Sequence, residues 1–214
     1  MSPIQIAREA KSNEVVRSRS LITSCYLECS MKPEAKAGLS GTGVAVMEVS
    51  RVQQFHPLFP KIKSHFDERA SGYSGLICKQ GFYHGCPVLY FQRASWTNDR
   101  MDQLKNETGI FFSIWMDDKT ASKNLAHYNI HALKLRKLAG YKIASRDFAN
   151  DFRSRFVSAR STWPNVSVDY GPLTLMQGWI ETELNTFEAD ALVLIEKFEH
   201  LAPQIDRLLE LRRK

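Results

Sequence analysis

The pattern of apolar and polar positions predicts strands in the middle of the chain. The segment 76–93 contains two runs rich in strand-forming residues, LICKQGFY and CPVLYFQR, with His84-Gly85 between them, and it predicts a β-hairpin. After Gly109, the nearly continuous apolar run IFFSIWM predicts a strand over 110–116 that is buried on both faces. Shorter apolar stretches at 44–52 and 165–169 are candidates for further strands.

Three other segments show the spacing of three and four residues between apolar positions that indicates amphipathic helices. These segments are 121–139, 145–158 and 186–211. Gly140 is expected to end the first of them, because glycine adopts the left-handed conformation at low cost. Pro203 is expected to kink or restart the last one. We therefore predict an α+β fold in which these three helices cover one face of a small mixed or antiparallel sheet.

Length and composition are consistent with a single globular domain. The chain has 214 residues, of which 43% are hydrophobic and 24% are charged. These fractions are close to the average of soluble globular proteins, so they exclude a disordered or collagen-like protein. We predict one domain over 1–214 with an N-terminal helical extension over about residues 1–40. No apolar run approaches the ~20 residues that span a bilayer, and the N-terminus lacks the apolar core of a secretory signal. We expect a cytoplasmic protein without a membrane partner.

Charge is distributed unevenly along the chain. The net charge is +6, but residues 119–160 contain ten basic and two acidic residues, whereas residues 161–210 contain two basic and nine acidic residues. The two blocks could neutralise each other or form two separate solvated faces. Alternatively, the basic block contacts the phosphates of a polyanion.

The basic block coincides with the two predicted helices on either side of Gly140. A short connection containing glycine is typical of helix-turn-helix units, and basic side chains on such a unit would neutralise phosphates. The first hypothesis is therefore a nucleic-acid-binding protein that uses a helix-Gly-helix unit over 119–160. An ordinary helical hairpin with solvated basic residues is the alternative. The candidate binding residues are Lys134, Arg136, Lys137, Lys142, Arg146, Arg153 and Arg155.

Carboxylates and a lysine follow the predicted strand 110–116. The triplet Asp117-Asp118-Lys119 resembles the D-x-K half of the PD-(D/E)xK nuclease pattern, although no Pro-Asp pair is present. The resemblance implies a metal-dependent nuclease in which Asp117 and Lys119 are catalytic. Asp99, or Asp102, would supply the further acid, and Asp99 and Asp117 would bind Mg²⁺. Alternatively, Asp118 or Thr120 simply caps the following helix.

A third hypothesis is a protein-interaction module without catalysis. Its contact surface would be the aromatic region 163–179 or the apolar heptads of the C-terminal helix. The cysteines do not favour a zinc site, because the spacings C-x3-C and C-x7-C differ from paired C-x2-C motifs. Mg²⁺ is implied only by the nuclease hypothesis, so the sequence leaves open whether the protein is an enzyme.

Overall fold

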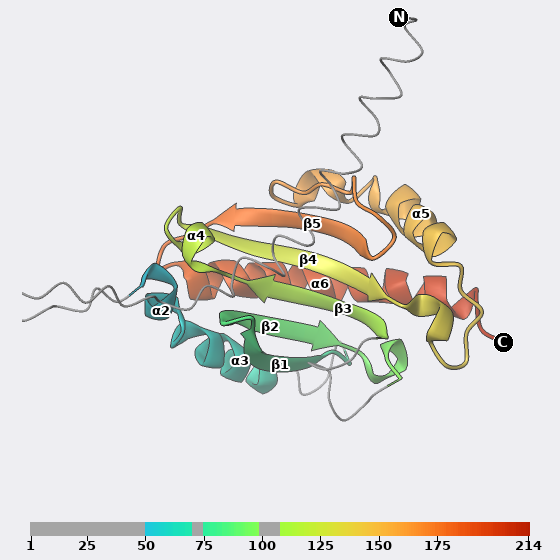
Figure 1. Ribbon diagram of the computed structural model, residues 1–214, viewed down its shortest axis with the longest axis horizontal. Helices are drawn as coiled ribbons and strands as arrows, with labels where there is room; N and C mark the ends of the chain where they lie inside the picture. The colour runs from blue at the N-terminus through green and yellow to red at the C-terminus, as the bar shows by residue number, and fades with distance from the viewer. Residues whose placement is uncertain (1–49, 70–74, 99–107) are drawn as a thin grey trace, which may run out of the picture. The chain divides into compact units, whose positions relative to one another are not determined.

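A computed structural model describes residues 50–69, 75–98 and 108–214. Five strands form one antiparallel sheet in which each strand pairs with the next along the chain, β1-β2-β3-β4-β5 (Figure 1). The α+β class is therefore confirmed. The described elements are α2 (Arg51–Phe55), α3 (Leu58–Arg69), β1 (Ile77–Tyr83), β2 (Cys86–Gln92), η2 (Ala94–Trp96), β3 (Gly109–Trp115), α4 (Asp118–Ala121), β4 (Leu125–Leu133), η3 (Leu135–Lys137), α5 (Ser145–Phe156), η4 (Arg160–Thr162), β5 (Thr174–Glu181) and α6 (Phe187–Glu210).

The long helix α6 packs against one face of the sheet. The ring of Phe198 stacks on Phe112 of β3 with centroids 4.7 Å apart, and it also contacts Phe91 of β2 and Tyr128 of β4. On the same face, α3 places Phe66 against Phe91. Burying each large apolar side chain contributes roughly 1.5–3 kcal/mol, so this layer forms the core.

The opposite face of the sheet, which we call the open face, has no helix over it in the described part of the chain (Figure 1). Strand register determines which side chains it carries, because successive residues of a strand point to opposite faces. Phe112 of β3 pairs with Ile130 of β4, and both face α6. Their neighbours Ser113 and Asn129 also pair with each other and therefore lie on the open face.

The predicted helix over 121–139 is wrong. This segment contains the short helix α4, strand β4 and the turn η3. Its even positions, from Ala126 to Ala132, alternate strictly with His127, Asn129 and His131, which is the pattern of a strand. Pairing with β3 on one side and β5 on the other makes β4 an interior strand of the antiparallel sheet. The helix-Gly-helix unit therefore does not exist.

The other predicted elements agree more closely. The hairpin over 76–93 and the strand over 110–116 are confirmed as β1, β2 and β3, and helices α5 and α6 occupy the segments 145–158 and 186–211. Helix α6 continues through Pro203 instead of restarting there. In the segment 165–169 only Ser167 forms a bridge, with Gln177, and residues 51–52 begin helix α2.

The predicted N-terminal helical extension and the strand residues 44–49 lie outside the described residues. The prediction of one domain over 1–214 therefore stays a prediction. Within the described ranges, no helix is long and apolar enough to cross a membrane.

Gly178 on β5 lies opposite Tyr128 on β4 and leaves room for the tyrosine side chain. A Cβ atom at position 178 would lie 2.9 Å from Cε1 of Tyr128 and closer still to Cζ and Oη. The Tyr128 hydroxyl donates a hydrogen bond to the carbonyl of Pro164, which holds the ring in place. Burial raises the pKa of Tyr128, so the hydroxyl keeps its proton. Only glycine fits at position 178 without displacing this ring.

Replacing Gly178 by alanine is expected to lower the free energy of unfolding by ~1–3 kcal/mol, because the tyrosine ring must move. Urea-induced unfolding measures the change. Gly171→Ala is the matched control, since nothing lies within 4 Å of a Cβ atom there. Equal stabilities of the two variants would contradict the close packing of Gly178 and Tyr128.

Candidate functional site

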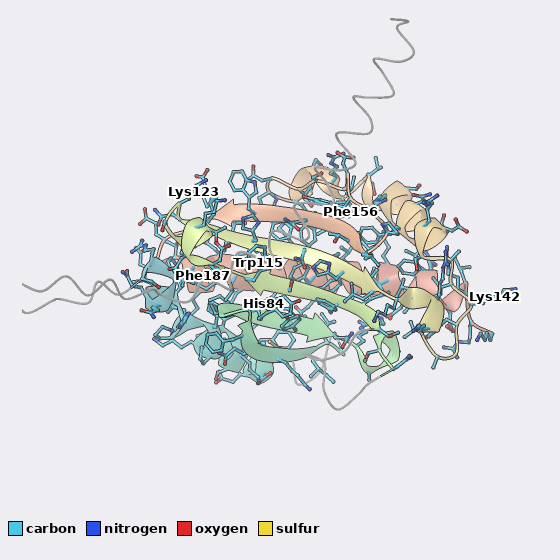
Figure 2. All side chains as sticks on the ribbon, viewed as in Figure 1. His84, Trp115, Lys123, Lys142, Phe156 and Phe187 are labelled. Carbon is cyan, nitrogen blue, oxygen red and sulfur yellow. The ribbon has the colours of Figure 1, made fainter. Side chains whose placement is uncertain are left out.

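Basic side chains gather where β4 ends and α5 begins. Arg136 and Lys137 belong to η3, Lys142 lies in the following loop, and Arg146 is in the first turn of α5. All four are exposed, and none forms an ion pair with a carboxylate among the described residues. Figure 2 shows Lys142 next to the C-terminal residues and Lys123 at the other end of the sheet.

The C-terminal tail adds further cations to this region. The backbone N–H of Lys142 donates to the carbonyl of Arg212 at 2.8 Å, and that of Lys214 donates to Gly140 at 3.0 Å. Sequence reasoning missed these residues, because only the fold brings the tail beside the loop. We call this surface the basic end. It comprises Lys134, Arg136, Lys137, Lys142, Arg146, Arg212, Arg213 and Lys214.

The basic end contains an open groove of about 600 Å³. Arg136, Lys142 and Arg212 contribute its cations, and Asp147 and Asp151 contribute its carboxylates. The Arg212 guanidinium pairs with Asp151, and the Arg213 guanidinium pairs with Glu210 at 2.8 Å. These two cations are partly neutralised within the protein, whereas Arg136 and Lys142 form no ion pair with a carboxylate among the described residues.

Two of the predicted binding residues do not belong to the basic end. The guanidinium of Arg153 donates to the carbonyl oxygens of Tyr170, Gly171 and Thr174 at 2.7–3.0 Å, so it fastens the loop before β5 to helix α5. Partial burial lowers its pKa. Arg155 is exposed but lies nine residues beyond Arg146 on α5, ~14 Å along the helix axis.

The proposed nuclease residues are only partly described. The Asp117 carboxylate accepts a hydrogen bond from the Thr120 backbone N–H at 2.7 Å and caps α4, and Lys119 is exposed on that helix. Asp99 and Asp102 lie outside the described residues. Within the described ranges, no group of three or more His, Cys, Asp or Glu residues could hold a metal ion. The Mg²⁺ site at Asp99 and Asp117 stays a prediction.

The two described cysteines do not share a site. Cys78 pairs with Phe91 and faces the helices, whereas Cys86, at the other end of the hairpin, belongs to the open face. Burial raises the pKa of the Cys78 thiol to about 12, so it is an apolar core residue and not a thiolate ligand. Cys25 and Cys29 lie outside the described residues.

Of the two surfaces of the interaction hypothesis, the heptad positions of α6 are buried, whereas the region 163–179 is buried only in part. Trp163 is 6% exposed and packs against Phe198, so it closes one end of the core. The apolar heptad positions of α6, from Phe187 to Leu208, are buried against the sheet and the neighbouring helices. They are therefore not available as a seam for a second chain.

Aromatic rings and histidines line the open face over β3, β4 and β5, a feature that the incorrect helix over 121–139 hid. Trp115, His127 and Trp179 are register partners across the three strands, and each is partly exposed. The Trp115 and His127 rings stack with centroids 4.7 Å apart and planes 22° from parallel. Closer to the basic end, the rings of Phe111 and His131 lie 5.3 Å apart.

Both histidines of β4 are uncharged at neutral pH. Burial lowers the pKa of His131 to about 4, although a hydrogen bond from Nδ1 to the Leu173 carbonyl partly opposes this shift. Burial also lowers the pKa of His127, and the nearby Asp117 carboxylate opposes it. The two rings lie four residues apart on one strand, ~13 Å along it, so they cannot share a metal ion.

The comparisons with known proteins identify no relative: no family model, no curated protein and no solved structure matches the chain. The function is therefore inferred from the geometry alone.

Stability is expected to fall as the pH decreases from about 6.5 to about 4. In this window the unfolded chain binds a proton at residue 131 that the folded chain excludes, so protonation favours unfolding. Chemical denaturation at several pH values measures the slope. His131→Gln is expected to make it shallower, whereas the control His200→Gln, at an exposed position of α6, keeps the wild-type slope. An unchanged slope in His131→Gln would contradict the exclusion of charge from this site.

Proposed function

We propose that this protein binds nucleic acid, with phosphates of the ligand held at the basic end. One observation carries the proposal: four exposed cations, from Arg136 to Arg146, lie together without an acidic partner among the described residues. Phosphate contacts by lysine and arginine supply most of the sequence-independent affinity of nucleic-acid-binding proteins.

The distribution of ion pairs supports this proposal, because the acidic block of the C-terminal helix does not neutralise these cations. Glu188 of α6 pairs with His65, and Glu196 pairs with Arg69, each at 2.7 Å. Asp206 pairs with Arg93 and accepts a hydrogen bond from the indole of Trp96. Three acidic residues of α6 thus pair with side chains on α3 or just after β2, and Glu210 pairs with Arg213 of the basic end.

The basic end is also held in a defined geometry. Backbone hydrogen bonds join the loop containing Lys142 to the C-terminal tail, and the Asn98 side chain bonds the backbone of Lys137 and Ala139. A surface whose backbone is fixed loses less conformational entropy when it binds a ligand. These contacts replace the predicted helix-Gly-helix unit as the support for the basic residues.

The triple variant Arg136→Gln, Lys137→Gln and Lys142→Gln is expected to weaken binding of a 16-nucleotide DNA. The slope of log affinity against log salt concentration should decrease by about 2, because each lost contact with single-stranded DNA removes ~0.7 from it. Fluorescence anisotropy of a labelled oligonucleotide, titrated at several salt concentrations, measures both quantities.

A second triple variant, Lys61→Gln, Lys123→Gln and Arg160→Gln, is the matched control. It removes the same charge from exposed positions elsewhere and is expected to keep the wild-type salt dependence. Equal losses in the two triple variants would show a diffuse effect of net charge and would contradict a defined phosphate site. Absence of binding by the wild-type protein at low salt would contradict the proposed function itself.

A further inference from the structure

The open face of β3, β4 and β5 carries two rows of rings with a polar row between them. The first row is Trp115, His127 and Trp179, and the second contains Phe111 and His131. Each row is ~6.7 Å from the next, because two residues of a strand separate them. The first row therefore places three rings side by side across the three strands, and two of them, Trp115 and His127, stack on each other.

The row between the rings consists of Ser113, Asn129 and Gln177, which are register partners. The Ser113 hydroxyl donates to the Asn129 amide oxygen at 2.6 Å, and Gln177 is partly exposed. Hydroxyl and amide groups both donate and accept hydrogen bonds. Ser113 and Asn129 are each 3% exposed and bond each other, so Gln177 is the residue of this row whose amide lies beside the rings and can reach the polar edge of a planar ligand.

This part of the open face is almost free of charge. Among the described residues of β3, β4 and β5 that lie on it, the one acidic side chain is Glu181 at the end of β5. Because burial lowers the pKa of both histidines, the two imidazoles are neutral at pH 7. The cations begin where β4 ends, at Lys134 and Arg136.

We infer that the open face binds the unstacked bases of single-stranded nucleic acid, while phosphates farther along the same strand contact the basic end, which begins ~23 Å along β4 from His127. The inference rests on the proposed function and names the class of nucleic acid. Bases stack on the rings of Trp115, Trp179 and Phe111, and Gln177 is placed to bond their edges. Each base stacked on an aromatic side chain adds affinity with little dependence on sequence.

A duplex does not fit this surface. In double-stranded nucleic acid the faces of the bases are stacked on one another, so they cannot lie on the rings of a sheet. The duplex can contact only the cations of the basic end. Single strands are therefore expected to bind more tightly than a duplex of the same sequence.

Intrinsic fluorescence tests where the bases lie. The chain has four tryptophans, of which Trp96 is fully buried and Trp163 is 6% exposed, whereas Trp115 and Trp179 lie partly exposed on the open face. Adding an unlabelled 16-nucleotide single strand to the full-length protein is expected to quench the emission. In the double variant Trp115→Phe and Trp179→Phe, binding is expected to persist by anisotropy, because phenylalanine still stacks, but the quenching should be lost.

A second double variant, Trp115→Leu and Trp179→Leu, removes the rings and keeps apolar side chains. It is expected to weaken single-strand binding at least about tenfold and to leave duplex binding unchanged. The unfolding midpoints of the leucine and phenylalanine variants are compared first. A leucine variant that fails to fold is replaced by the single substitution Trp179→Leu.

The outcomes separate the two proposals. If the protein binds single strands and duplexes equally and the leucine variant loses nothing, the inference about the open face is overturned while the proposed function stands. If the protein binds neither, the proposed function fails first. A third outcome is that sedimentation shows a dimer for the wild-type protein and a monomer for the leucine variant. In that case the open face is an interface between two copies of the chain, and the inference is overturned.

Discussion

The packing of α6 against one face of the sheet determines what every other part of the molecule can do. Phe198 contacts β2, β3 and β4 through Phe91, Phe112 and Tyr128, so one helix fixes three strands. Because side chains alternate along a strand, the register that directs Tyr128 toward the helix also directs His127 to the other side. A shift of the strand register by one residue would turn the core side chains of β4 to the open face and the open-face side chains to the core. The composition of the open face is thus a direct consequence of the core.

Electrostatics divides the molecule in a way that agrees with this architecture. Three carboxylates of α6 pair with His65, Arg69 and Arg93, which lie on α3 and directly after β2, and a fourth, Glu210, pairs with Arg213 of the C-terminal tail. The cations after β4 remain exposed, and the C-terminal tail joins them through backbone hydrogen bonds. An uncharged surface lined with aromatic rings therefore lies on the same sheet that ends in the cations, with the row of Phe111 and His131 nearer to them, and the proposed ligand has both planar rings and phosphates.

The sequence was sufficient to predict the hairpin, strand β3 and the two long helices, since each carries a strong local signal. It failed at β4, where Leu125, Tyr128 and Ala132 also fit a helical spacing. The alternation of apolar and polar residues from Ala126 to Ala132 indicates a strand instead. The segment forms a strand because it pairs with β3 and β5. Asp117 shows a second limit, because a carboxylate after a strand looks the same in sequence whether it caps a helix or binds a metal.

The residues of the basic end and of the open face were predictable from the sequence only in part, because local patterns do not show the contacts that each side chain makes. The basic residues after β4 were recognisable as a group, but Arg153 could not be told apart from them without its carbonyl partners. The contribution of the tail and the rows of rings depend on contacts between segments that are distant in the chain. Such contacts depend on the topology of the fold, and a local sequence pattern does not reveal that topology.

Mapping of backbone amide chemical shifts by NMR, as a single-stranded 16-nucleotide DNA is added to the full-length protein, tests the central claim most directly. The account predicts that the largest changes fall on β3, β4 and β5 and on residues 134–146, with the exposed surface of α6 nearly unaffected. Changes confined to the exposed surfaces of α3 and α6, or no changes at all, would contradict it.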